Sequence, residues 1–229
     1  MTLALLALGL ACLPLAAQSI EEAARQKRSG IEALSAGNVE QAEVALRKAC
    51  DLSPADEEAC YYFARTLHVR GNYEAAREPF DKALRAASKA TRPRVHRAIA
   101  LNFMALGMAA EAEGHFLQAI QLNGGAVAGT EDPQVDYGAF LFRQGRTDEA
   151  LRPLEQAVRD VPASPKANTE WGRVLLHVGR LEQAVSALEK AVLFDPKNAG
   201  AHLLLGRAYM RLGRTSDGER ELKLGAGGR

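Results

Sequence analysis

The sequence has 229 residues, of which 47% are hydrophobic and 25% charged, the proportions of an ordinary globular protein. Its 29 basic residues stand against 28 acidic ones, so a formal net charge of +1 excludes a global basic excess that would grip nucleic acid or an anionic membrane. With 6% aromatic residues and 3 cysteines, the composition also excludes collagen-like, disordered and disulfide-scaffold proteins.

The chain begins with an apolar segment, residues 1–17, that carries no charged side chain. Its apolar run is shorter than the roughly 20 residues that span a membrane, and it ends in Ala16 and Ala17. The segment predicts a secretory signal peptide cleaved after Ala17, although no basic residue precedes the apolar run. The alternatives are a lipoprotein signal that ends before Cys12 and an apolar helix docked on the fold. We therefore expect an exported protein, periplasmic or extracellular, with lipid-anchored or cytoplasmic proteins as the alternatives.

Six glycines recur at regular intervals along the rest of the chain, each in the same short sequence context, and so mark a repeat. They lie 34, 36, 38, 34 and 34 residues apart, with a helical pattern before and after each one. A period of 34 residues with two helices and a glycine turn resembles the tetratricopeptide repeat. The glycines are Gly37, Gly71, Gly107, Gly145, Gly179 and Gly213.

The resemblance implies an all-α fold, a right-handed α-solenoid of antiparallel helix pairs known as the tetratricopeptide superhelix. In the last copy the second helix is rich in glycine, so we expect it to fray or to be covered by another surface. The residues that follow Asn123, up to Thr130, predict a looser junction. The six copies are residues 23–56, 57–90, 93–126, 131–164, 165–198 and 199–229.

Small residues recur where the first helix of each copy would cross the second, because small side chains let helix backbones approach. Large apolar residues, predicted to be core, recur between them. The small residues are Gly30, Ala64, Ala100, Gly138, Gly172 and Gly206 on the first helices and Ala42, Ala76, Ala112, Ala150, Ala184 and Gly218 on the second. The large ones include Leu46, Phe80, Phe116, Leu154, Leu188 and Leu222.

One position departs from the family in every copy. Where the family places a bulky residue, this chain has Gln26, Cys60, His96, Gln134, Asn168 and His202. The single tryptophan, Trp171, stands three residues after Asn168 and is predicted to be core rather than a ligand platform.

No motif for chemistry is present in the sequence. The five histidines show no metal-binding spacing, and there is no nucleophile elbow, phosphate loop, dinucleotide fingerprint or C-x-x-C pair. We therefore predict that the protein is not an enzyme, with no catalytic residue, no cofactor and no metal.

In the family, certain positions of the first helices line a concave groove, so the resemblance implies a binding surface. Those positions hold nine basic residues here against the acidic Glu58 and Asp132, which predicts an acidic peptide or protein segment as ligand. The predicted groove residues are Lys27, Tyr61, Arg65, Arg94, Arg97, Met104, Phe142, Arg143, Arg173, Leu176, Arg207, Met210 and Arg211, and Lys166 completes the nine basic ones.

The predicted function is a non-catalytic protein–protein interaction scaffold. The alternatives are a cytoplasmic adaptor and a non-catalytic subunit of an enzyme or of a secretion or export complex. No nucleic acid is expected as a partner, because few aromatic residues are placed for base stacking. Contact with a membrane is expected only through the N-terminal leader, if it is retained or lipidated.

Two cysteines lie at the facing ends of neighbouring predicted helices. Cys50 is at the end of the second helix of copy one, and Cys60 is in the first turn of the first helix of copy two. In an oxidising compartment a disulfide between them could join the first two copies. The sequence favours the other interpretation, two free cysteines that behave as small buried hydrophobic residues.

Overall fold

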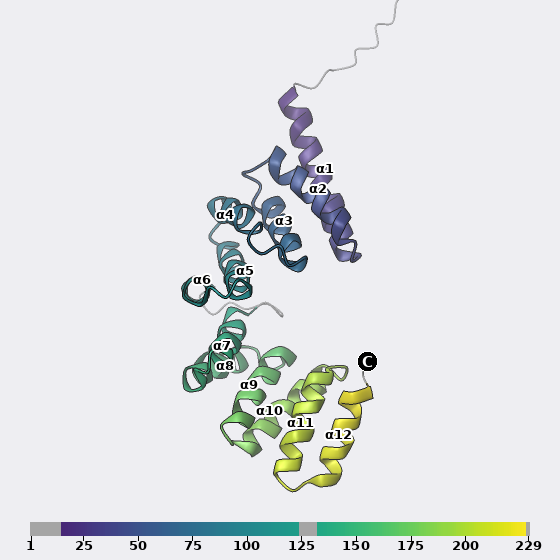
Figure 1. Ribbon diagram of the computed structural model, residues 1–229, viewed down its shortest axis with the longest axis vertical. Coiled ribbons are helices and arrows are strands. Elements are labelled where there is room, and N and C mark those ends of the chain that lie inside the picture. The colour runs from purple at the N-terminus through teal and green to yellow at the C-terminus, as the bar shows by residue number, and fades with distance from the viewer. Residues whose placement is uncertain (1–14, 124–131, 228–229) are drawn as a thin grey trace, which may run out of the picture. The chain divides into compact units, whose positions relative to one another are not determined.

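The computed structural model describes residues 15–123 and 132–227, and in this part of the chain all regular secondary structure is α-helical. Contacts divide the chain into two compact units, residues 1–88 and residues 89–229. Within each unit, successive helices pack as pairs joined by tight turns (Figure 1). The predicted all-α solenoid of helix pairs is confirmed.

From Leu15 onward, the first unit contains two helix pairs. Helix α1, Leu15–Ser35, packs along α2, Val39–Leu52, and helix α3, Glu57–Val69, packs along α4, Arg77–Ala86. Contacts between α2 and α3 join the pairs.

The second unit contains four helix pairs in the described residues, and each pair packs against the next. The first helices of these pairs also touch one another, α5 against α7, α7 against α9 and α9 against α11. The helices are α5 Arg92–Ala105, α6 Ala109–Asn123, α7 Pro133–Arg143, α8 Thr147–Asp160, α9 Pro165–His177, α10 Leu181–Phe194, α11 Ala199–Arg211 and α12 Thr215–Gly227.

The six glycines that mark the repeat follow the first helix of each pair. All six adopt the left-handed conformation, with φ between 75° and 79°. No other residue of the described chain has a positive φ. At Gly179 the turn is closed by the next amide, since Arg180 N donates to Leu175 O at 2.9 Å. Glycine is required here because a Cβ costs roughly 1–2 kcal/mol in this conformation.

The predicted close crossing of paired helices is confirmed. A Cβ added to Gly172 would lie 2.5 Å from Leu188 Cγ on the partner helix, far inside van der Waals contact. On the second helices, Ala150 and Ala184 are fully buried. The small residues thus set the distance between the two helices of a pair.

Two outcomes were expected for the last helix, fraying or cover by another surface, and the structure does not show fraying. Helix α12 runs through Gly227, and two of its glycines face α11. A Cβ on Gly218 would lie 3.0 Å from Gly206 O, and one on Gly225 would lie 3.0 Å from Ala199 O. These glycines weaken the isolated helix but allow the two backbones to meet, so packing replaces lost helix propensity.

The predicted leader falls mostly outside the described residues, and the predicted loose junction at residues 124–130 falls there entirely. The expected cleavage point after Ala17 lies in the first turn of α1. None of the helices in the described ranges is long and apolar enough to span a membrane.

Candidate functional site

The first helices of the second unit carry most of the predicted binding residues. We call the A-helix surface the side chains near the C-terminal ends of α5, α7, α9 and α11. Its defining residues are Met104, Phe142, Arg143, His177, Arg207, Met210 and Arg211. Arg143, His177, Arg207 and Arg211 are exposed, Met210 is 42% exposed, and Met104 and Phe142 are half-buried.

Side-chain contacts link neighbouring helices along this surface. The Arg143 guanidinium lies 3.7 Å from Met104 Sδ, so α7 reaches α5. The ring of Phe142 meets the edge of His177 with centroids 5.2 Å apart, which joins α7 to α9. Arg211 joins α11 to α9 in the same way, since its Nη1 donates to Leu176 O at 2.6 Å. That carbonyl belongs to the last turn of α9, where a cation is favourable.

Two predicted groove cations prove to be structural. Asp136, buried on α7, accepts from Arg97 Nε at 2.5 Å and from Lys166 Nζ at 2.6 Å. The carboxylate thus ties α5, α7 and α9 together. Arg97 is only 9% exposed, so its prediction as a ligand-binding residue is wrong. Burial requires this charge to be paired.

In the first unit the predicted residues also serve the fold. Tyr61 is 1% exposed, packed against Tyr62 and Phe80, and so cannot touch a ligand. The guanidinium of Arg65 lies over the Tyr61 ring, 5.7 Å from its centroid. The prediction of Tyr61 as a groove residue is wrong because its ring fills the core.

Lys27 lies between two carboxylates of the following helix pair. Its Nζ is 2.8 Å from Asp56 Oδ2 and 3.3 Å from Glu58 Oε2. Burial disfavours the charged amine, but the hydrogen bonds and charges of Asp56 and Glu58 outweigh it and raise the pKa of Lys27. This cation is already neutralised within its own unit.

Arg173 borders a shallow cavity of about 320 Å³ between α9 and α11. Its Nε lies 3.0 Å from Glu170 Oε2, and the cavity is also lined by Lys166 and Asp195. Charges of both signs therefore line it. Leu176, one turn further along α9, is 8% exposed and belongs to the core, so its prediction as a groove residue is wrong.

The basic excess that the sequence predicted is thus smaller on the folded chain. Acidic residues outside the groove positions, Asp56, Asp136 and Glu170, pair with four of the nine cations. Arg94 is half-buried. Arg207 is exposed and has no ion pair among the described residues. Arg143, also exposed, contacts Met104 and has no ion pair within residues 15–123 and 132–227.

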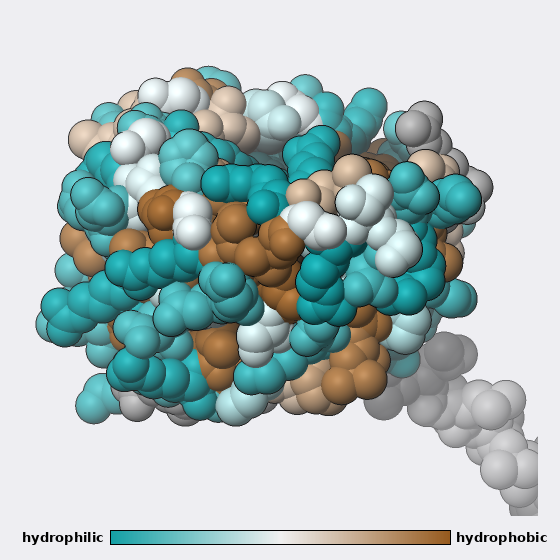
Figure 2. Space-filling view, turned by 90° about the horizontal axis from the view of Figure 1, so that it is seen from below, coloured by the Kyte–Doolittle hydropathy of each residue, from teal (hydrophilic) through white to brown (hydrophobic). Residues whose placement is uncertain are grey.

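The space-filling view shows patches of hydrophobic residues bordered by hydrophilic ones rather than one continuous apolar face (Figure 2). Within the described chain, the exposed large hydrophobic residues are spread over several helices.

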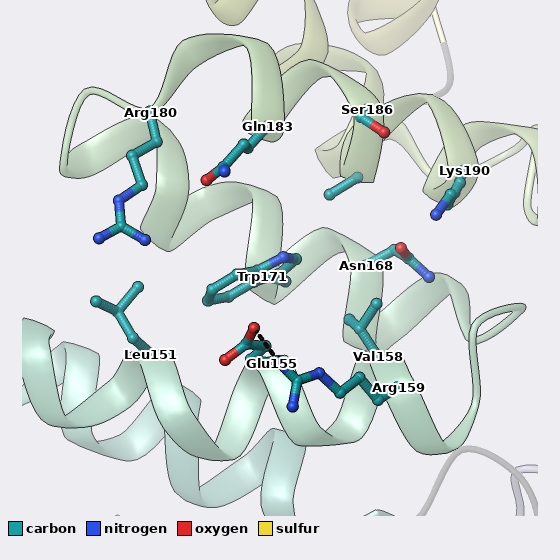
Figure 3. Close-up of a pocket in the computed structure, with 11 residues that line it drawn as sticks. Leu151, Glu155, Val158, Arg159, Asn168, Trp171, Arg180, Gln183, Ser186 and Lys190 are labelled. Atoms are coloured by element: carbon teal, nitrogen blue, oxygen red, sulfur yellow. Dashed lines mark hydrogen bonds and ion pairs between the residues drawn. The ribbon is translucent and has the colours of Figure 1, made fainter.

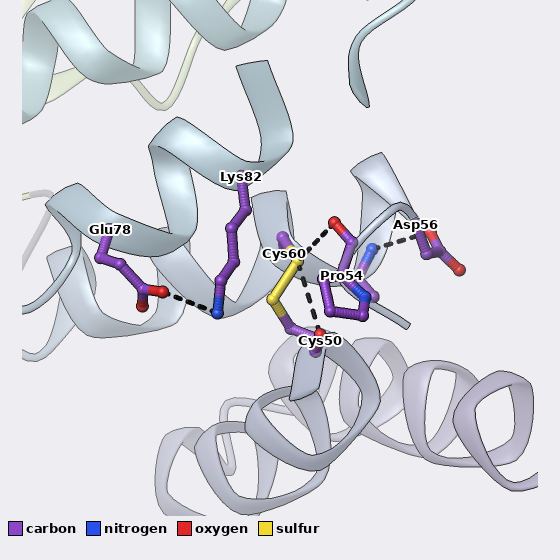
Figure 4. Close-up of a disulfide and its surroundings, with 7 residues drawn as sticks. Cys50, Pro54, Asp56, Cys60, Glu78 and Lys82 are labelled. Atoms are coloured by element: carbon purple, nitrogen blue, oxygen red, sulfur yellow. Dashed lines mark hydrogen bonds and ion pairs between the residues drawn. A yellow bond between two sulfur atoms is a disulfide. The ribbon is translucent and has the colours of Figure 1, made fainter. Parts of the chain in front are cut away.

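The structure joins Cys50 and Cys60 in a disulfide, drawn in Figure 4. Their Cα atoms are 4.8 Å apart, within the usual range for a bridge. The two residues are 1% and 0% exposed, so the bond lies in the interface of α2 and α3, behind the turn that contains Pro54. The sequence favoured free thiols at these positions.

His96, His115 and His202 act in packing. His96 Nδ1 and His115 Nδ1 are 3.0 Å apart, and burial, with the charges of His115 and Arg92, lowers the pKa of His96 to about 4. In the last pair, His202 lies between Glu221 Oε2 at 2.7 Å and Pro196 O at 3.0 Å. Over the described ranges, no group of three metal-ligating side chains comes together.

The sequence model of the tetratricopeptide repeat matches residues 33–101, 141–197 and 175–226, which is more than half of the chain. No curated protein sequence matches.

Solved structures share the fold at low sequence identity. The complex Cut9-Hcn1 superposes with a TM-score of 0.76 at 16% identity, covering 91% of this chain and 40% of that one. PilF from Pseudomonas aeruginosa superposes with a TM-score of 0.74 at 21% identity, covering 89% and 90%. YrrB, described as having an unusual peptide-binding site, superposes with a TM-score of 0.56 at 23% identity, covering 81% and 92%. This chain thus spans less than half the length of the Cut9-Hcn1 chain.

Proposed function

Because the chain belongs to the tetratricopeptide repeat family, we propose that it is a non-catalytic scaffold that binds a peptide or protein segment on the A-helix surface. The observation that carries the proposal is the exposed pair of cations, Arg143 and Arg207, beside the accessible apolar side chains of Phe142 and Met210. Such a surface offers charge for orientation and apolar contact for affinity.

The ligand is an acidic segment with at least one apolar side chain. Arginine binds carboxylates through a planar fork of donors, and neither Arg143 nor Arg207 is held by a carboxylate within the described chain. A methionine beside each helps accommodate apolar side chains of different shape, since its side chain adapts to its neighbour. The peptide-binding site of YrrB, which shares this fold, supports a peptide ligand here.

Charge reversal on the A-helix surface tests the proposal. We predict that Arg143→Glu with Arg207→Glu weakens binding of acidic peptides about tenfold, because exposed ion pairs contribute up to about 1 kcal/mol each. Binding is measured by fluorescence anisotropy with an array of labelled, end-blocked acidic peptides that each contain one leucine or phenylalanine. Affinity for the wild type should fall as salt screens the charges.

The matched control reverses two exposed cations elsewhere in the same unit, Arg152→Glu on α8 with Lys223→Glu on α12. This variant keeps the same net charge as the test variant and should bind like the wild type. Equal weakening by both variants would show a non-specific charge effect and sink the acidic-ligand proposal. An RNA oligonucleotide serves as the negative ligand.

We also propose that the protein acts in an exported, oxidising location. The apolar leader of residues 1–17 and the buried pairing of Cys50 with Cys60 both support it, since disulfides persist outside reducing compartments.

A further inference from the structure

A second cavity of about 410 Å³ lies away from the A-helix surface, between the second helices α8 and α10 and over α9. We call it the B-helix cavity. Figure 3 shows the Trp171 ring at its centre, between the α8 and α10 side chains, with Arg180 and Lys190 at opposite ends. Its volume falls within the range of small-ligand and peptide side-chain pockets.

Comparison with two other helix pairs shows which side chain is missing from this cavity. In α11 and α12, His202 meets Glu221, and in α5 and α6, His96 meets His115, in each case 19 residues further along the chain. In α9 and α10 the residue at that spacing from Asn168 is Ala187. Both line the cavity, so a short side chain stands where those two pairs have a large polar one.

Asn168 is left with an unpartnered acceptor. Its side chain is fully buried, and Nδ2 donates to Pro162 O at 2.9 Å and to Ser164 O at 2.8 Å. These two bonds fix the amide, and Oδ1 accepts no hydrogen bond from any residue that the structure describes. A buried acceptor without a donor costs free energy.

The rim of the cavity is positively charged. Among its lining residues Glu155 pairs with Arg159 at 2.6 Å, whereas Arg180 and Lys190 have no carboxylate partner in the described chain. One turn beyond Lys190, Leu193 is 70% exposed on α10. The ring of Trp171, with Leu151 and Val158 of α8, makes the interior apolar.

We propose that the B-helix cavity is a second ligand site, which takes an apolar, preferably aromatic, side chain of a partner peptide flanked by carboxylates. The aromatic side chain packs against Trp171, and the flanking carboxylates meet Arg180 and Lys190. The charge of the rim selects this occupant over a basic or neutral segment. The site is independent of the A-helix surface, because different helices and side chains form it.

The chain contains one tryptophan, so Trp171 fluorescence reports directly on this cavity. The probe is the end-blocked peptide acetyl-Asp-Asp-Phe-Asp-Asp-amide. We expect a saturable change in Trp171 emission on titration. The variant Arg180→Glu with Lys190→Glu should weaken the affinity at least about tenfold. The peptide with lysine in place of aspartate should give no saturable change.

Two further variants sharpen the test. Ala187→Gln fills the cavity and brings an amide donor towards Asn168, so it should remove the response while helix content stays unchanged by circular dichroism. Arg143→Glu with Arg207→Glu, on the A-helix surface, should leave the response intact, which separates this inference from the proposed function. The inference is overturned if Trp171 gives no saturable response, if the response survives Arg180→Glu with Lys190→Glu, or if sedimentation shows that these residues instead hold two copies of the chain together.

Discussion

At the scale of single residues, the helix crossings obey a pairing rule that recurs along the chain. Wherever the first helix has glycine at the crossing, the residue sixteen positions later is leucine, as in Gly172 and Leu188. Wherever it has alanine, as in Ala64, that later residue is phenylalanine, here Phe80. The branched Cγ of leucine lies over the glycine and excludes a methyl group, whereas a flat ring leaves room for one. The other pairs are Gly30 and Leu46, Ala100 and Phe116, Gly138 and Leu154, and Gly206 and Leu222.

The rule makes Gly172→Ala destabilising despite alanine's better helix propensity. The new Cβ would meet Leu188 Cγ, and overpacking costs about 1–3 kcal/mol against a propensity gain of about 1 kcal/mol. We predict a net loss of about 1 kcal/mol in the free energy of unfolding, measured by urea denaturation. Adding Leu188→Phe should recover part of that loss, so the double variant is more stable than the two single effects predict. Simple additivity would show that the pairing has no energetic basis.

At the scale of helices, the sequence predicts the pairs well because each first helix ends at a glycine that must adopt a positive φ. It predicts α12 poorly because the role of the glycines in this helix depends on contact with another helix. Propensity counts Gly218 and Gly225 only as helix-weakening residues, whereas their value lies in close contact with α11, which exists only once both helices have formed. The pairing of Cys50 with Cys60 depends in the same way on how α2 meets α3.

The bridge between α2 and α3 leads to a stability prediction. Oxidised protein should show no reaction of Cys50 or Cys60 with thiol reagents after denaturation without reductant, and peptide mapping should recover the linked pair. Reduction should lower the free energy of unfolding by about 3 kcal/mol, the chain-entropy value for so short a loop. Denaturant unfolding of oxidised, reduced and Cys50→Ala with Cys60→Ala protein measures this difference. Two free thiols in protein recovered from its native location would refute both the bridge and the proposed oxidising compartment.

At the scale of the whole chain, composition says little about the binding surfaces. A net charge of +1 does not reveal a local excess of basic residues, and a count of the basic groove positions overestimates that excess. The family positions indicate which helix faces carry Arg143 and Arg207, and the structure leaves both exposed. The family positions do not include Asp136, which follows one of them directly in the sequence. Its buried carboxylate pairs with Arg97 and Lys166.

The reason for that error is geometric. A pattern along one helix shows which face a residue occupies, but it does not show which side chain of the next helix reaches it. Trp171 illustrates the same limit: the sequence predicts it as core, and it does pack against the apolar clusters on both sides, yet it also lines the B-helix cavity. That cavity depends on Ala187 standing opposite Asn168, which only alignment of helix pairs in space brings together.

The central claim, that the A-helix surface binds the ligand, is tested most directly by methionine oxidation with and without a bound acidic peptide from the array. Met210, 42% exposed, and Met104 belong to this surface, whereas Met108, in the turn before α6, does not and serves as internal control. Peptide mapping by mass spectrometry gives the rate of sulfoxide formation at each site. We predict that saturating peptide slows oxidation of Met210 and Met104 several-fold and leaves Met108 unchanged. Unchanged rates at Met210 and Met104 while the peptide is fully bound would contradict the claim.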